Sequence, residues 1–126
     1  MMRIKAAPLL IAVALALVTT PAVAAEEVSY ALDVFPILNS RCVACHHPGG
    51  EGHQKTGLDL STYDGLMKGT QHGAIVVPGD PLTSNLIVVI EGRASPAIRM
   101  PHNQRPLLKA QQQILRDWVK QGAKNN

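Results

Sequence analysis

The chain has 126 residues, of which 46% are hydrophobic, 17% charged and only 3% aromatic, with two Cys and a formal net charge of +3. This length predicts one small domain and excludes the larger dinucleotide-binding and barrel enzymes. Without its first 24 residues, the chain keeps ten Lys and Arg against nine Asp and Glu, a net charge of +1. No basic stripe is present, so we expect no nucleic-acid partner and no strong electrostatic steering.

The N-terminal segment has the pattern of a secretory signal peptide. Arg3 and Lys5 precede an apolar run of 13 residues from Ala6 to Val18, and the small residues Ala22-Val23-Ala24 follow. A membrane anchor is the alternative, but spanning a bilayer takes about 20 apolar residues. The sequence therefore predicts a cleaved signal peptide over residues 1–24 and an exported, periplasmic domain over residues 25–126, with no transmembrane segment in the mature chain.

A helical pattern then leads into the most informative motif. Residues 28–41 carry apolar side chains at helical spacing, and Pro36 must either start the regular helix or kink it. Next comes Cys42-Val43-Ala44-Cys45-His46, which is the attachment signature of c-type haem. Its two thiols form thioethers with the haem vinyl groups, and His46 is the proximal iron ligand. A thioredoxin-like redox pair and half of a zinc site are the alternatives, although the chain lacks their usual context.

The remaining elements follow in chain order. Residues 47–60 are Gly-rich and are predicted to form a loop along one haem edge. Residues 61–64 resemble a capping box that opens a short helix ending at Gly69. A turn is expected at residues 78–81, a third helix over residues 82–91 and a last helix from Pro106 or Leu107 to Gly122. Residues 74–77 could instead form a short strand, but they have no partner.

The loop between the last two helices is where a second axial ligand is expected. Met100-Pro101 lies there, 54 residues after His46. A thioether in the sixth coordination position raises the reduction potential relative to a second His. Met100 could also be a core gap filler, and His102, His72 or an open site are the alternatives for the iron. Arg93, Arg99 and Arg105 flank this loop and are candidates for contacts with the haem propionates.

Several segments together resemble the planctomycete-type cytochrome c domain, a branch of the class I cytochromes c. They are DVFPILNSRCVACH, GLDLSTYDGL, IVVPGDP with TSNLI, RMP, and LRDWVKQGA, and the resemblance runs from Tyr30 to Ala123. It implies a small all-α class I cytochrome c fold in which the N- and C-terminal helices pack beside one covalent haem c. It also implies His46 and Met100 as axial ligands. Where the family often reads Met-Pro-Pro, this chain has His102 after Pro101.

The expected function is outer-sphere electron transfer by a mono-haem c-type cytochrome outside the cytoplasm. The iron cycles between Fe(III) and Fe(II), the protein is not an enzyme, and its partners are an oxidase, a dehydrogenase, a reaction centre or another cytochrome. Two alternatives remain: a haem-carrying subunit of a larger electron-transfer complex, and a haem enzyme or sensor with a displaceable sixth ligand. We further expect Phe35 and Trp118 to form the aromatic contact where the terminal helices cross.

Overall fold

The computed structural model describes residues 22–126, and most of the predicted signal peptide lies outside this range. The described residues form helices joined by loops and contain no β-strand, so the all-α prediction is confirmed. In chain order the helical elements are η1 (Tyr30–Val34, a π-helical turn), α1 (Phe35–Arg41), α2 (Glu51–Thr56), α3 (Tyr63–Lys68), α4 (Asn85–Ile90), η2 (Pro96–Ile98, a 3₁₀ turn) and α5 (Lys109–Lys120). Within residues 22–126, no helix has the length and apolar character needed to cross a bilayer.

The N-terminal helix begins at Tyr30, two residues later than the pattern suggested. Ser29 caps it, because the Ser29 hydroxyl accepts a hydrogen bond from the Leu32 amide. Pro36 occupies one of the first two positions of α1, immediately after the π-helical turn. Proline is tolerated there because the first helical amides have no intrahelical acceptor. Pro36 therefore starts the regular helix, which was one of its two expected roles.

The predicted loop over residues 47–60 is wrong in part, because it contains α2. Its glycines mark helix ends as well as loop positions. Gly50 is the N-cap of α2, and Gly57 ends the helix in the left-handed conformation, with φ of +74°. The next prediction is confirmed for the short helix and its end at Gly69, but not for the capping box over residues 61–64. Thr62 is the N-cap of α3 and accepts a hydrogen bond from the Gly65 amide, and glycine has no side chain that could return a bond to the cap.

The second half of the chain matches the predicted helices, with later starts. α4 begins at Asn85 because the buried Ser84 side chain is engaged with the preceding turn: it accepts a bond from the Val77 amide and donates one to the Asp80 carbonyl. α5 begins at Lys109 rather than at residue 106 or 107. The segment 74–77 forms no strand, and the nearby pairing is a single bridge between Thr70 and Gly73.

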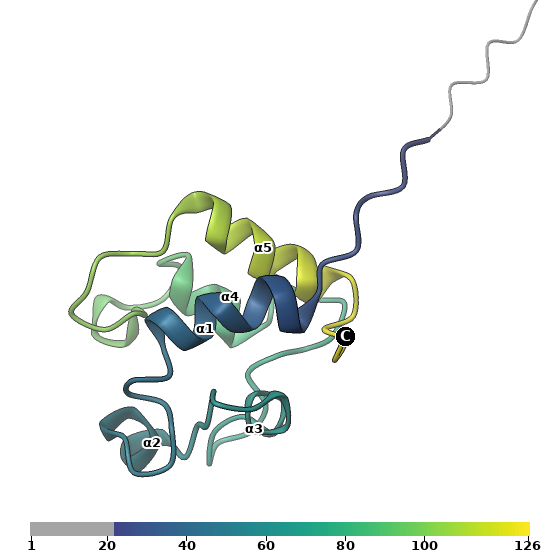
Figure 1. Ribbon diagram of the computed structural model, residues 1–126. Coiled ribbons are helices and arrows are strands. Elements are labelled where there is room, and N and C mark those ends of the chain that lie inside the picture. The colour runs from purple at the N-terminus through teal and green to yellow at the C-terminus, as the bar shows by residue number, and fades with distance from the viewer. Residues whose placement is uncertain (1–21) are drawn as a thin grey trace, which may run out of the picture.

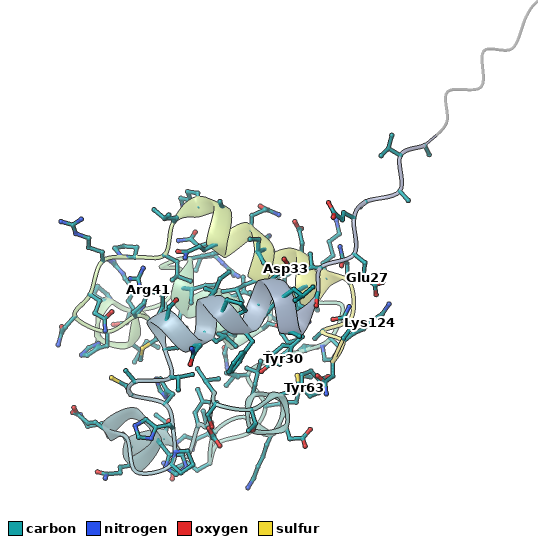
Figure 2. The ribbon with its side chains drawn as sticks, in the orientation of Figure 1. Glu27, Tyr30, Asp33, Arg41, Tyr63 and Lys124 are labelled. Atoms are coloured by element: carbon teal, nitrogen blue, oxygen red, sulfur yellow. The ribbon has the colours of Figure 1, made fainter. Side chains whose placement is uncertain are left out.

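The terminal helices cross at an aromatic cluster, with α2 and α3 on the other side of the N-terminal helix from α5 (Figure 1). Trp118 of α5 is 1% exposed, and its ring centroid lies 5.7 Å from that of Tyr30 and 6.4 Å from that of Tyr63. Figure 2 shows Tyr30 and Tyr63 on neighbouring segments beneath this crossing. The predicted Phe35–Trp118 contact is wrong. Phe35 packs on Tyr30, and Tyr30 is the residue of the N-terminal helix whose ring contacts Trp118.

Candidate haem attachment site

The Cys42–His46 motif continues directly from the last turn of α1. The Cys42 and Val43 amides donate to the Leu38 carbonyl at 2.8 and 3.0 Å. The Cys45 and His46 amides then both donate to the Cys42 carbonyl, at 3.2 and 3.0 Å. These bonds wind the motif into a compact turn. Local hydrogen bonds therefore hold Cys42, Cys45 and His46 on one compact stretch of backbone.

His46 is the buried polar residue of this turn, with 8% of its surface exposed. Its Nδ1 atom is buried and has no hydrogen-bond partner. Burial lowers the pKa of the His46 imidazole, and the nearby Leu58 carbonyl acts in the opposite direction but does not reverse this shift. The ring is therefore kept neutral at physiological pH, which is the form in which histidine ligates metals.

α2 forms a wall against this imidazole. A Cβ atom on Gly52 would lie 2.7 Å from Cε1 and 2.9 Å from Nδ1 of His46, so the helix approaches the ring more closely than any other residue type would permit. The His53 amide donates to the Cys45 carbonyl at 3.0 Å, and the Leu60 amide donates to the His46 carbonyl at 2.8 Å. The segment after the motif thus folds back over it and fixes the ring.

The two thiols differ in their surroundings. Cys45 is exposed, whereas Cys42 is half-buried and packs against the core. Burial raises the pKa of the Cys42 thiol to about 11. Redox and zinc-binding cysteines work as thiolates and have lowered pKa values. The environment of Cys42 therefore disfavours both alternatives to haem attachment. Within residues 22–126, no group of three or more His, Cys, Asp and Glu side chains is arranged to hold a metal ion.

Met100 lies in the long loop between α4 and α5, half-buried and packed against the core. Its amide donates to the Val89 carbonyl at 3.2 Å, and the following Pro101 is buried. The Arg41 guanidinium, at the end of α1, donates to the Arg105 carbonyl at 2.6 Å. This bond ties the loop that carries Met100 to the residue immediately before Cys42.

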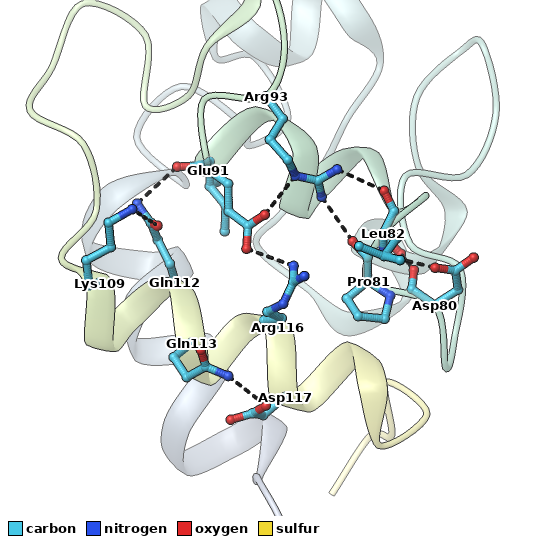
Figure 3. A network of polar contacts seen from close by, with 12 residues as sticks. Asp80, Pro81, Leu82, Glu91, Arg93, Lys109, Gln112, Gln113, Arg116 and Asp117 are labelled. Carbon is cyan, nitrogen blue, oxygen red and sulfur yellow. Dashed lines mark hydrogen bonds and ion pairs between the residues drawn. The ribbon is translucent and has the colours of Figure 1, made fainter.

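The other candidate ligands are placed differently. His102 and His72 are both exposed. Met67 lies in α3 and is half-buried against the core, so burial alone does not separate it from Met100. Of the three loop arginines, Arg99 and Arg105 are exposed. Arg93 is held by Glu91 at 2.8 Å and by the Leu82 and Pro81 carbonyls (Figure 3).

Two surface recesses lie away from the Cys42–His46 turn. One, of about 490 Å³, is lined by polar and charged side chains between the end of α4 and the start of α5. The other, of about 330 Å³, lies beside Tyr30 and Tyr63. Neither is lined by Cys42, Cys45, His46 or Met100.

Two residues with evident structural roles were not predicted. The contact of Gly52 with His46 could not be predicted, because a single glycine in a Gly-rich segment looks like an ordinary loop residue. Gln112 is buried in α5. Its position in the helical pattern predicts an inward-facing side chain, whereas glutamine is usually exposed. A polar residue at an inward-facing register position is the signal by which Gln112 could have been found.

The donor set and its surroundings fit covalent haem: two thiols in a tight turn and a neutral buried imidazole with one ring nitrogen unpartnered. None of the curated proteins and none of the solved structures compared with the chain gives a match. A family model described as Planctomycete cytochrome C matches residues 42–103, from the first cysteine of the motif to beyond Met100. The expected resemblance to the planctomycete-type cytochrome c domain is therefore confirmed over residues 42–103, and a cytochrome c domain suggests a haem-binding electron carrier.

Proposed function

We propose that the protein is a mono-haem c-type cytochrome that carries electrons between redox proteins outside the cytoplasm. Cys42 and Cys45 hold the haem through thioethers, His46 is the proximal ligand and Met100 is the distal ligand. The observation that carries the proposal is the hydrogen-bonded Cys42–His46 turn, in which a buried, neutral imidazole packs directly against Gly52.

Each residue has a separate task in this proposal. The thioethers keep the cofactor on the protein, and the wall formed by α2 limits rotation of the His46 ring. Met100 offers a soft sulfur from a loop that hydrogen bonds tie to α4 and α1. When bound, haem c supplies one-electron chemistry at iron, and a His/Met ligand pair favours a higher potential than two histidines. The exposed positions of His102 and His72 support Met100 as the ligand.

The location and partners follow from the same proposal. The signal-peptide pattern predicts export to the periplasm, and haem attached by covalent bonds is retained there. The partners are other redox proteins, such as an oxidase, a dehydrogenase, a reaction centre or a second cytochrome. No substrate is transformed, so the protein is a carrier rather than an enzyme.

The first experiment is the optical spectrum of the purified protein, oxidised and reduced, with its mass measured in parallel. We expect the mass of one covalently bound haem, no free thiol and a low-spin c-type spectrum. In the ferric state, the weak far-red band of methionine–iron coordination should be present. It should be lost in Met100→Ala and retained in Met67→Leu, the matched change at the other half-buried methionine.

Other spectra would overturn parts of the proposal. A low-spin haem without the far-red band would exclude Met100 and point to His102 or His72. A high-spin ferric spectrum would show an open site and favour the enzyme or sensor alternative. A protein without haem but with both thiols free, after expression with a functioning attachment system, would contradict the cytochrome assignment as a whole.

A further inference from the structure

The segment between α4 and α5, residues 91–108, carries Met100 and is tied down at both ends. It contains one 3₁₀ turn and is otherwise irregular. Long irregular segments open more easily than helices unless their ends are fixed. The residues that join its two ends therefore determine how firmly Met100 is held.

Gln112 of α5 makes this connection. It is 7% exposed, and its Nε2 donates to the Ile90 carbonyl at 3.2 Å and to the Leu107 carbonyl at 3.1 Å. Ile90 is the last residue of α4, and Leu107 lies just before α5. One side-chain amide thus bridges the residues at which the segment leaves α4 and rejoins α5. Its Oε1 accepts a bond from the Lys109 ammonium at 3.2 Å, so both ends of the amide are satisfied.

An ion-pair network lies beside this amide, on the surface of the same junction (Figure 3). Glu91 accepts from Arg116 of α5 and from Arg93, each at 2.8 Å. These charged groups are partly exposed, so each pair contributes little on its own. Gln112 differs from them because its bonds are buried, and a buried carbonyl that loses its donor keeps the full desolvation penalty.

We propose that Gln112 is a positioning residue for the Met100 ligand: it holds the ends of the 91–108 segment together and thereby keeps the Met100 sulfur at the iron. This inference rests on the proposed function, in which Met100 is the distal ligand. The side chain of Gln112 bonds to Ile90, Leu107 and Lys109 and not to Met100, so it acts through the backbone of the segment. It also lies outside the region matched by the family model.

The test compares Gln112→Met with Gln113→Met in the haem-loaded protein as it is purified after export. Both substitutions replace an amide by an apolar side chain of similar length on the same helix, but Gln113 is exposed and bonds only to Asp117. Two measurements are made: the affinity of the ferric protein for added imidazole, which binds only when the methionine leaves, and amide hydrogen exchange over residues 93–107. Gln112→Glu is measured as well, in case Gln112→Met does not fold. This substitution preserves the shape of the side chain and removes its hydrogen-bond donor.

For Gln112→Met or Gln112→Glu we expect imidazole affinity to rise by about tenfold, since loss of a buried hydrogen bond favours the open state by roughly that factor. Amide exchange over residues 93–107 should accelerate by a similar factor, whereas exchange in α3 should not change. In Gln113→Met, both imidazole affinity and exchange should remain as in the wild type. Unchanged imidazole affinity and unchanged exchange in a folded Gln112 variant would overturn the inference. If the wild-type protein lacks the methionine–iron band, the assignment of Met100 as the ligand fails by itself. Amide exchange over residues 93–107 that accelerates in the Gln112 variants would then show that Gln112 joins the ends of the segment, but not that it positions a ligand.

Discussion

The imidazole of His46 is constrained by its immediate contacts rather than by the motif alone. In the proposed function the Cys-x-x-Cys-His motif supplies the atoms that bind haem, but the position of the ring depends on Gly52, whose Cα hydrogen leaves room for Cε1 and Nδ1. A methyl group at residue 52 would require the ring or α2 to move, because a contact of 2.7 Å is too short for carbon atoms.

Gly52→Ala therefore tests the wall behind His46. We expect the haem-loaded variant to lose about 1–3 kcal/mol of stability through overpacking and to show a shifted reduction potential, because the imidazole that would ligate the iron is displaced. Urea denaturation and redox titration measure the two effects. Lys55→Ala, an exposed change on the same helix, should leave the potential unchanged. A Gly52→Ala protein with wild-type stability and potential would show that α2 does not press on the ring.

At the scale of elements, the junction of the N-terminal helix with α5 supports the Cys42–His46 turn, which follows the same helix. Trp118 fills this junction among Tyr30 and Tyr63, and its indole Nε1 donates to the Lys124 carbonyl at 2.9 Å. The Tyr63 hydroxyl donates to the Ala123 carbonyl, which anchors the chain after α5 to α3. The cluster thus joins three elements that are distant in sequence.

Trp118→Ala should be among the most destabilising single changes in the chain. Truncation of a buried aromatic residue costs about 3–5 kcal/mol, and here it also leaves the Lys124 carbonyl without its donor. Equilibrium urea unfolding of the haem-loaded protein measures the loss. Leu108→Ala, at a side chain that is 69% exposed, is the control and should change stability by less than about 0.5 kcal/mol. Equal effects of the two changes would contradict the assignment of the core.

For the molecule as a whole, periodicity and capping signals predicted the helical class and the approximate place of four helices, because these depend on local sequence. Contacts between distant segments were not predictable in the same way. α2 was missed because glycines that terminate a helix and a glycine that packs on His46 look alike in sequence. The sequence does not distinguish Phe35 from Tyr30 as the partner of Trp118, because both lie on the N-terminal helix. In the structure it is the Tyr30 ring that contacts both Phe35 and Trp118.

The small net charge of the mature chain conceals a strong segregation of charges along it. After Gly92 the chain carries seven Lys and Arg and a single acidic residue, Asp117, whereas residues 22–92 carry eight Asp and Glu and three Lys and Arg. The basic part comprises the Met100 loop and α5, which lie together on one side of the molecule (Figure 1). The expectation of weak steering considered only the net charge, but at ordinary ionic strength a reactant responds to charges within about 10 Å.

If electrons pass to and from the haem near the Met100 loop, small anionic reagents should be attracted there. We expect oxidation of the ferrous protein by ferricyanide to slow as NaCl is added, because screening weakens attraction by the basic segment. Lys109→Gln should lower the rate constant at low salt, whereas Lys68→Gln, on α3 in the acidic part of the chain, should change it less. Stopped-flow absorbance at several ionic strengths measures both effects. A rate constant that rises with salt would place electron exchange at the acidic part, because like charges repel the oxidant less when they are screened.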